Sequence, residues 1–423
     1  MRDYPPSCFA IRQSIEKEAR RVSRLYGYEE VETPVVEETS LFRRTLGSGS
    51  DVVQKEMFEF KDKSSMDVTL RPEGTAGIGR MITRKDFALY RSLPHRFFYC
   101  GPMFRYERPQ KGRQRQFSQV GVECIGEESS LADAEVVIMA HQFLDNLELA
   151  STPKLQINTL GDYQDRLAYK TELTNFLQER KEDLSGDSLN RLERGAVLRI
   201  LDSKDSNDQE LLKGAPRLED FLSERSSARF EKVLHTLEEE EIPFQRSSYL
   251  VRGLDYYCHT VFEYVSSEIG AQGAVLAGGR YDGLVESLGG PPTSAVGWAA
   301  GTDRLALLRT EINDFQFRPI CAIIPAGNQN EETEDLIKGH CMQVAGALRR
   351  GGIETHLQYK TRHTSKLLAT ALQSGASAAV FIGENEVSRG KFIFKDLKSR
   401  AEREINSLDE LADAVANTVN AFS

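Results

Sequence analysis

The stretch of sequence that decides the fold reads Gly101-Pro-Met-Phe-Arg-Tyr-Glu-Arg-Pro-Gln-Lys-Gly-Arg-Gln-Arg-Gln-Phe-Ser-Gln-Val-Gly-Val-Glu123. Strand-like runs flank a turn-forming segment from Pro109 to Gly112, which predicts a β-hairpin with Arg105 at the end of its first strand. Between Arg96 and Arg115 the chain carries six basic residues and one acid. Arginines on such a hairpin can offer paired donors to phosphate oxygens, although a hairpin with merely solvated basic residues would show the same pattern.

The returning strand of this hairpin carries polar side chains on one face. Side chains alternate along a strand, so this face holds Phe117, Gln119, Gly121, Glu123 and Ile125. Gln119 and Glu123 flank a glycine, and the space beside it predicts a site where a small ligand lies on the sheet. A carboxylate and an amide suit a ligand with N–H donors, such as an ammonium or an imidazole. An exposed polar strand face is the alternative interpretation.

A second cluster of candidate site residues reads Leu250-Val-Arg-Gly-Leu-Asp-Tyr-Tyr-Cys-His-Thr-Val-Phe262. It places a cation, Arg252, shortly before Asp255 and two adjacent tyrosines. Adjacent residues of a strand face opposite sides, so at most one of Tyr256 and Tyr257 is expected to line a pocket. A core strand with a structural Arg–Asp pair is the alternative.

Two shorter segments add candidates, and several motifs are absent. Thr69-Leu-Arg-Pro-Glu-Gly-Thr75 contributes the carboxylate of Glu73 just past a strand, and Gly278-Gly-Arg-Tyr-Asp-Gly283 has glycines that permit close backbone approach to a ligand. The P-loop and dinucleotide-binding glycine patterns do not occur, which excludes an ordinary phosphate-binding loop. No cysteine or histidine spacing matches a zinc site, and no metal ligand is assigned.

Length and composition indicate a multidomain globular protein. The 423 residues carry a net charge of −10, and 40% of them are hydrophobic, which fits two or three domains. No apolar run is long enough for a membrane span, and the first residues lack the apolar core of a secretory signal. The six cysteines are scattered, as is typical of reduced thiols. We therefore expect a cytoplasmic protein.

Periodicity divides the chain into regions. Helical patterns cover 11–25 and 133–149, and strand patterns cover 28–34, 66–70, 97–100 and 117–125. Charged residues alternate with leucines at helical spacing from about 163 to 240, which predicts a helical insertion. A polar link at 313–319 precedes a β-α-β pattern, with strands at 320–324, 378–382 and 392–397. This last part is expected to form a small α/β domain with a parallel or mixed sheet.

Taken together, these stretches resemble the histidyl-tRNA synthetase family of the class II aminoacyl-tRNA synthetases. Residues 28–34, 101–123 and 295–305 are similar to the three class II motifs, and residues 250–257 and 277–282 are similar to the two signatures of the histidine-specific members. The resemblance implies an α+β fold with an antiparallel sheet of six or seven strands. The catalytic domain would span 1–315, with the helical insertion at about 163–240. An α/β anticodon-binding domain would span 316–423.

The resemblance also implies a function. L-Histidine would be ligated to tRNA(His) through a histidyl-adenylate, with ATP as substrate, Mg²⁺ accompanying it, and the chain acting as a homodimer. The histidine carboxylate needs no general base to attack the α-phosphorus, so the first step mainly requires positioning and charge stabilisation. No set of magnesium ligands follows from the sequence.

Residue roles follow from the same resemblance. Arg105 and Arg252 are the expected catalytic residues, which hold the α-phosphate and stabilise its developing charge. The residues expected to bind ATP are Arg105, Glu107, Arg113 and Arg304, with Glu107 beside the adenine. The residues expected to bind histidine are Glu73, Thr75, Arg105, Gln119, Glu123, Arg252, Tyr256 and Tyr257. Within that set, Glu73, Thr75 and Gln119 would take the amino group, and Glu123 and Tyr257 would take the imidazole.

Two departures from the family pattern and three alternatives remain. Asp303 stands where the third motif usually has Glu, and Cys258 stands where Asn is common. A non-catalytic regulatory subunit of ATP phosphoribosyltransferase would typically lack the last domain and the ATP-clamping arginines, both of which are present here. An accessory nucleic-acid-binding protein would need neither Arg252 nor Glu123. The two histidine signatures disfavour proline, threonine or glycine as the amino acid.

Overall fold

The computed structural model describes residues 3–47, 50–84, 93–108, 110, 112–251, 256–269, 273–309, 320–327, 331–360 and 363–420. Contacts divide the chain into two compact units, Met1–Glu311 and Ile312–Ser423. The polar link expected at 313–319 lies outside the described residues.

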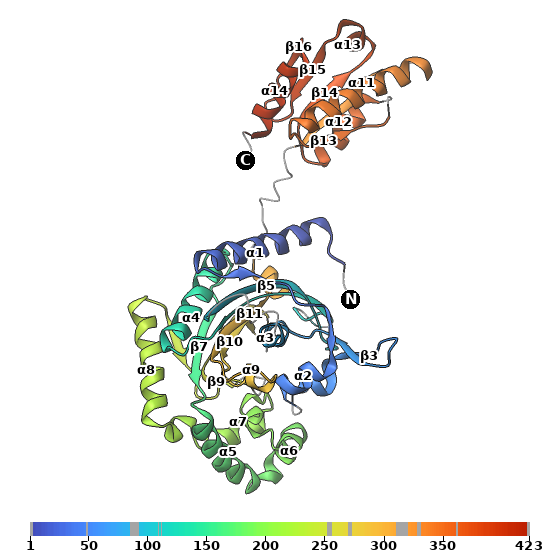
Figure 1. Ribbon diagram of the computed structural model, residues 1–423. Helices are drawn as coiled ribbons and strands as arrows, with labels where there is room; N and C mark the ends of the chain where they lie inside the picture. The colour runs from blue at the N-terminus through green and yellow to red at the C-terminus, as the bar shows by residue number, and fades with distance from the viewer. Residues whose placement is uncertain are drawn as a thin grey trace. The chain divides into compact units, whose positions relative to one another are not determined.

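An eight-stranded sheet forms the centre of the first unit (Figure 1). Its strands, in spatial order, are β1 (Glu29–Glu30), β5 (His95–Phe104), β6 (Gln116–Ile125), β11 (Ala295–Gly301), β10 (Ala274–Arg280), β9 (Cys258–Val265), β7 (Lys154–Thr159) and β8 (Phe244–Arg246). The six inner strands are antiparallel, whereas β1 pairs parallel to β5 and β8 pairs parallel to β7. The antiparallel sheet is therefore confirmed, with one parallel strand added at each edge.

The hairpin predicted from the quoted stretch is β5 and β6, which pair over ten residues from His95–Ile125 to Phe104–Gln116. Its turn includes positions 109 and 111, which lie outside the described residues. The motif at 28–34 forms only the two-residue strand β1, because pairing with β5 is limited to Phe97 and Phe98.

Three long helices cover the convex face of the sheet in Figure 1: α1 (Pro6–Leu25), α4 (Ser130–Asp145) and α8 (Glu224–Glu239). Their apolar sides form one core with alternate residues of β6, including Val120 and Val122. Phe143 of α4 stacks on Trp298 of β11 with ring centroids 5.5 Å apart. The intervening residues of β6, among them Gln119 and Glu123, therefore face the concave side, where short helices α3 (Thr75–Thr83) and α9 (Leu284–Ser287) lie.

The expected helical insertion is helical, but its last helix belongs to the sheet's core. Helices α5 (Tyr163–Gln178), α6 (Gly186–Glu193) and α7 (Ser206–Leu212) pack around buried leucines on the concave side. By contrast, α8 packs on α4 through residues such as Phe230 and Leu234. Leucine periodicity identifies both kinds of helix and does not distinguish the surfaces on which they pack.

A small sheet and short helices complete the first unit. The sheet has the order β2 (Val36–Glu38), β4 (Asp67–Leu70), β3 (Phe58–Lys61) and lies beside α2 (Thr39–Leu46). Helix α10 (Thr302–Leu308) follows directly from β11. The motif segment 295–305 is thus a strand that runs into a helix.

The second unit has a mixed sheet, one of the two arrangements that its β-α-β pattern predicts. The strand order is β13 (Thr355–Leu357), β12 (Ile320–Pro325), β14 (Ala376–Ile382), β15 (Phe392–Asp396) and β16 (Glu402–Ile405), with the first three parallel and the last two antiparallel. The helices are α11 (Glu331–Arg350), α12 (Thr364–Gln373), α13 (Glu384–Arg389) and α14 (Leu408–Asn420).

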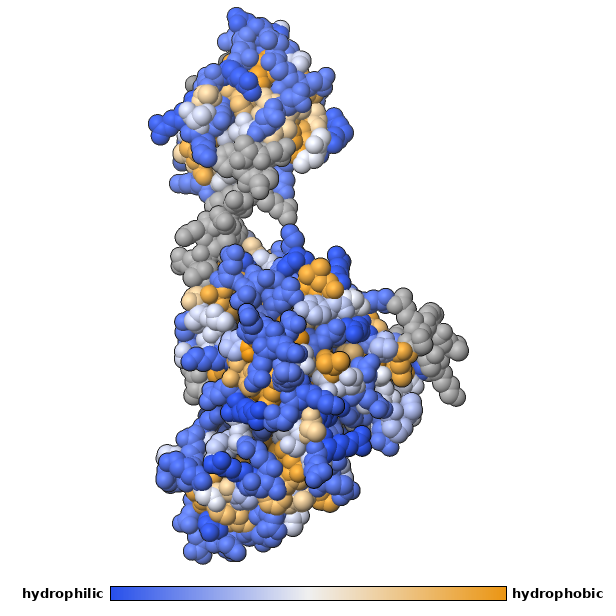
Figure 2. Space-filling view, turned by 90° about the vertical axis from the view of Figure 1, so that its left-hand side faces the viewer, coloured by the Kyte–Doolittle hydropathy of each residue, from blue (hydrophilic) through white to orange (hydrophobic). Residues whose placement is uncertain are grey.

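The polarity of the surface and the state of the cysteines agree with what the composition predicts. Figure 2 shows a face that is mostly hydrophilic, with apolar residues in small groups. Within the described residues, no helix combines the length and the apolar character that crossing a membrane requires. All six cysteines are free thiols.

Candidate active site

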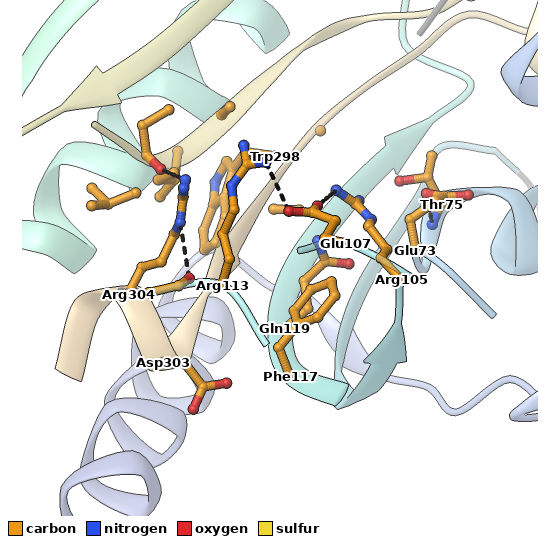
Figure 3. Close-up of a pocket in the computed structure, with 18 of the residues that line it drawn as sticks. Glu73, Thr75, Arg105, Glu107, Arg113, Phe117, Gln119, Trp298, Asp303 and Arg304 are labelled. Carbon is orange, nitrogen blue, oxygen red and sulfur yellow. Dashed lines mark hydrogen bonds and ion pairs between the residues drawn. The ribbon is translucent and has the colours of Figure 1, made fainter. Parts of the chain in front are cut away.

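A cleft of roughly 200 Å³ opens on the concave face of the sheet, above β6, β10 and β11. It brings together most of the residues predicted from the sequence, and Figure 3 shows several of them converging on it. The predicted residues that line it are Glu73, Thr75, Arg105, Glu107, Arg113, Gln119, Glu123, Tyr256, Tyr257 and Arg304. Arg252 and Asp255 lie outside the described residues.

Glu123 marks the deep end of the cleft. Its side chain is buried, and its carboxyl accepts hydrogen bonds from Thr75 Oγ1 at 2.6 Å and from the hydroxyl of Tyr281. Burial raises the pKa of the Glu123 carboxyl to about 8, although the two hydrogen bonds act in the opposite direction. Tyr281 was missed as a site residue because the sequence marks it only by the surrounding glycines, and its reach to Glu123 depends on strand order.

A second buried carboxyl, that of Glu73, lies at the start of α3. It accepts hydrogen bonds from the backbone N–H groups of Thr75 at 2.7 Å and Ala76 at 2.8 Å. Carboxylates are stabilised at such helix N-termini by the free N–H groups. Burial nevertheless raises the pKa of Glu73. Two acidic groups therefore share the deep end of the cleft and suit a ligand with several N–H donors.

The space beside Gly121 differs from the prediction. A side chain at Gly121 would come within 2.5 Å of the Tyr99 ring, so Tyr99 of β5 fills the gap that was expected to hold a ligand. Tyr99 in turn donates a hydrogen bond to Gln119 Oε1 at 3.3 Å. The glycine admits an aromatic side chain from the neighbouring strand, and the ligand space lies between Gln119 and Glu123 on one side and β10 and β11 on the other.

The two adjacent tyrosines also differ from the prediction. Tyr256 and Tyr257 both line the cleft, and their ring centroids are 4.6 Å apart. Strand β9 begins only at Cys258, so strand alternation does not apply to them. Arg166 of α5 donates to the carbonyl of Tyr257, which ties this turn to the helical insertion. Cys258 itself accepts from the backbone N–H of Asp282 at 3.5 Å.

Arginines gather at the other end of the cleft. Arg105 donates to the carbonyl of Pro72 at 3.0 Å, and Arg113 pairs with Glu107 at 2.7 Å. The Arg105 guanidinium also lies 5.4 Å from the ring centroid of Phe117. These contacts hold two guanidinium groups toward one volume, as binding of a polyphosphate requires.

Arg304 completes this end from α10. Its Nε donates to the carbonyl of Gly112 at 3.3 Å, and its Nη1 donates to the carbonyl of Ala274. Burial lowers the pKa of Arg304, and the neighbouring charge of Arg113 lowers it further. The preceding residue, Asp303, bonds elsewhere: it accepts from Tyr4 and from the backbone N–H of Ser118. Within the described residues, no group of three or more His, Cys, Asp or Glu is arranged to hold a metal ion.

Comparison with known proteins identifies the family. The family model for histidyl-tRNA synthetase matches residues 1–305, and a model for an anticodon binding domain matches residues 321–418. The chain belongs to the histidyl-tRNA synthetase family.

Individual relatives support this assignment over nearly the whole length. The chain is 45% identical to the histidine–tRNA ligase of Rhodospirillum rubrum over 98% of this chain and 97% of the relative. It is 43% identical to the histidine–tRNA ligase of a Synechococcus species over 96% of both. A solved structure of apo histidyl-tRNA synthetase from Staphylococcus aureus matches with a TM-score of 0.79 at 31% identity, over 98% of each chain.

One further structural likeness shows the fold alone. A Bacillus halodurans protein described as an ATP phosphoribosyltransferase regulatory subunit/histidyl-tRNA synthetase matches with a TM-score of 0.63 at 23% identity, over 90% of this chain and 97% of that one. The histidyl-tRNA synthetase scaffold is thus shared with a protein for which a regulatory role is named.

Proposed function

We propose that the chain ligates L-histidine to tRNA(His) in an ATP-dependent reaction that passes through histidyl-adenylate. The observation that carries the proposal is one cleft with two chemically different ends. Buried carboxyls and tyrosines form the deep end, and three arginines form the other. Relatives named histidine–tRNA ligase match over nearly the full chain, which supports the same activity.

The deep end would bind histidine. Glu123 and Tyr257 take the imidazole, with Tyr256 packed beside them and Tyr281 and Thr75 holding the Glu123 carboxyl. The α-ammonium group fits Glu73, Thr75 and Gln119, which offer oxygen acceptors. An amino acid without ring nitrogens leaves buried polar groups unpaired, and such a loss reaches discrimination of about 10⁴-fold in favourable cases.

The arginine end would bind ATP. Arg105 would hold the histidine carboxylate and the α-phosphate. Arg113 and Arg304 clamp the outer phosphates, and Glu107 lies by the adenine. Mg²⁺ would accompany ATP and offset the negative charge of its phosphates, and no residue is assigned to hold it. Arg252, from the signature before Tyr256, is assigned to the α-phosphate by resemblance alone.

In the first step, a histidine carboxylate oxygen bonds to the α-phosphorus while the bond from that phosphorus to the bridging oxygen breaks. Pyrophosphate leaves with the electron pair, and histidyl-adenylate remains. Arg105 and Arg252 stabilise the negative charge that develops on the α-phosphate oxygens. In the second step, a terminal ribose hydroxyl of tRNA attacks the carbonyl carbon, AMP leaves, and the hydroxyl proton is released.

The partners and location are assigned in the same way. The catalytic domain is taken as 1–315 and the anticodon-binding domain as 316–423, which binds tRNA(His). The protein acts as a homodimer. Six free cysteines suit the reducing cytoplasm. The regulatory-subunit alternative is less well supported, because the ATP-clamping arginines and the C-terminal unit are both present.

The test is ATP–pyrophosphate exchange by the purified protein with each of the twenty amino acids in turn. We expect histidine alone to support exchange, followed by histidine-dependent acylation of tRNA(His). If none of the twenty amino acids supports exchange, the result would favour the regulatory-subunit alternative. Exchange with a different amino acid would refute the assignment of the deep end.

A further inference from the structure

Side chains continue the β6–β11 ladder past the end of β11. The last backbone pair in this ladder is Gln119 with Gly301. One residue earlier in β6, the backbone N–H of Ser118 donates to Asp303 Oδ2 at 3.0 Å, and the carbonyl of Ser118 accepts from Thr302 Oγ1 at 3.3 Å. The first two residues of α10 thus satisfy backbone groups that β11 no longer reaches.

Tyr4 binds the other oxygen of the same carboxylate. Its hydroxyl donates to Asp303 Oδ1 at 2.7 Å. Burial raises the pKa of Tyr4, and the charge of Asp303 raises it further, so the hydroxyl keeps the proton that it donates. Hydrogen bonds to charged acceptors are the stronger kind. The segment before α1 is therefore fastened to the first turn of α10.

This contact belongs to a cycle of interactions among five residues, Tyr4, Arg12, Glu16, Ser118 and Asp303, in which the link from Ser118 to Asp303 is made by the Ser118 backbone N–H. Ser118 Oγ donates to Glu16 Oε1 at 2.9 Å, and Arg12 Nε lies 3.4 Å from the same oxygen. The Arg12 guanidinium lies 4.7 Å from the centroid of the Tyr4 ring. Because side chains alternate along β6, Ser118 points away from the face that carries Phe117 and Gln119. Asp303 also lines the cleft, so these residues border its arginine end.

Arg304 follows Asp303 directly, and Figure 3 shows the two side chains pointing in different directions. Arg304 donates to the carbonyls of Gly112 and Ala274, which line the cleft with it. Asp303 instead accepts hydrogen bonds from the Tyr4 hydroxyl and the Ser118 backbone N–H. A short helix moves as one body, so the anchor on Asp303 sets the place and tilt from which Arg304 projects.

We propose that Tyr4 is a positioning residue for the reaction. Its hydrogen bond to Asp303 fixes the start of α10 and so holds Arg304 where the outer phosphates of ATP bind. The inference rests on the proposed function, because it takes ATP as the ligand of Arg304. Tyr4 touches neither substrate and acts only through Asp303 and α10.

The test uses Tyr4→Phe, which removes the hydroxyl and keeps the ring beneath Arg12. In histidine-dependent ATP–pyrophosphate exchange, we expect the KM for ATP to rise about five-fold, as loss of one charged hydrogen bond that acts through a helix would give. The KM for histidine should change less than about two-fold, because the contacts at Glu123 are untouched.

Tyr26→Phe is the matched control. Tyr26, which directly follows α1, also donates its hydroxyl to a residue of another helix, Gln142 Oε1 of α4 at 2.8 Å, and it does not line the cleft. Both KM values should stay at the wild-type level in this variant. A general loss of stability would affect the KM for ATP and the KM for histidine alike, in both variants. The proposed role instead predicts a rise in the KM for ATP alone, and only in Tyr4→Phe.

A double-mutant cycle with Asp303→Ala locates the effect in the bond itself. Tyr4→Phe should add little to Asp303→Ala, because alanine has no group that accepts from the Tyr4 hydroxyl and either change removes the same interaction. The inference would be overturned by an unchanged KM for ATP in Tyr4→Phe, by equal effects on both KM values, or by fully additive effects in the cycle. In each of these cases, histidine-dependent exchange by the wild type would leave the proposed function intact. Absence of histidine-dependent exchange in the wild type would overturn both.

Discussion

At the scale of single residues, Glu123 illustrates how burial and neighbours set the chemistry of the cleft. Its carboxyl is buried between Thr75 and Tyr281, and burial raises its pKa to about 8. Before histidine binds, the carboxyl is therefore expected to hold a proton for most of the time at neutral pH. An imidazole, with an ordinary pKa of about 6.5, can share that proton in the pair that histidine binding would form.

Glu123→Gln should change how stability depends on pH. The pKa of about 8 for Glu123 in the folded state lies above the ordinary value of a glutamate in the unfolded chain. At a pH between these two pKa values, the Glu123 carboxyl is protonated in the folded state and ionised in the unfolded state. Wild-type stability then falls as pH rises through this window, by at most about 1.4 kcal/mol per pH unit for one group. Glutamine does not titrate. The melting temperature of the variant minus that of the wild type should therefore increase from pH 5 to pH 8 and level off above.

Tyr281→Phe serves as the comparison for that measurement. The hydrogen bond from Tyr281 lowers the pKa of Glu123, so Tyr281→Phe should raise that pKa. The pH range in which stability falls should then extend to higher pH. A melting-temperature difference between Glu123→Gln and wild type that is constant from pH 5 to pH 8 would contradict the assigned protonation.

At the scale of elements, the sequence specifies what depends on local periodicity. The alternation along β6 correctly placed Gln119 and Glu123 on one face, and the cleft lies on that face. The hairpin, the long helices α1 and α4, and the mixed sheet of the second unit follow from patterns within single segments. These features need no knowledge of which strands become neighbours.

Features that depend on distant pairing could not be predicted. Tyr99 fills the space beside Gly121 only because β5 and β6 pair in one register. Tyr281 directly follows β10, and β11 lies between β10 and the strand β6 that carries Glu123. The hydrogen bond from Tyr281 to Glu123 therefore depends on the strand order of the sheet. Tyr256 and Tyr257 precede β9 in a turn whose geometry alternation does not describe.

Gly121→Ala tests this packing. The added methyl would meet the Cζ and hydroxyl oxygen of Tyr99, each at 2.5 Å, and the Tyr99 side chain is buried. We expect a loss of about 1–3 kcal/mol in stability, as overpacking gives. Displacement of Tyr99 also removes its hydrogen bond to Gln119, so the KM for histidine should rise in pyrophosphate exchange.

Gly283→Ala is the control for that change. Gly283 precedes α9 with φ −86°, and a side chain there meets no atom within 4 Å. Its melting temperature and KM for histidine should match the wild type. If Gly121→Ala behaves in the same way, the Tyr99 ring does not limit the space beside Gly121.

At the scale of the whole molecule, charge is unevenly distributed. The net charge is −10, yet the hairpin segment from Arg96 to Arg115 is strongly basic. Some of this charge is used internally, because Arg96 pairs with Glu135 and Arg113 pairs with Glu107, both at 2.7 Å. Arg108, near the turn of the hairpin, is exposed. A local basic surface of this kind can bind nucleic acid despite an acidic total.

Binding of tRNA(His) should therefore weaken steeply with salt. Each phosphate contact contributes about −0.7 to −0.9 to the slope of log affinity against log salt concentration. Arg108→Gln should make that slope shallower by about one contact. Arg21→Gln removes the same charge from α1, on the sheet face opposite the cleft, where Arg21 pairs with Glu18 at 2.7 Å. This control should keep the wild-type slope. Filter binding from 50 to 300 mM KCl (roughly the range in which counterion release is resolved) measures all three slopes, and a flat wild-type profile, or equal slopes for both variants, would show that the hairpin does not contact tRNA.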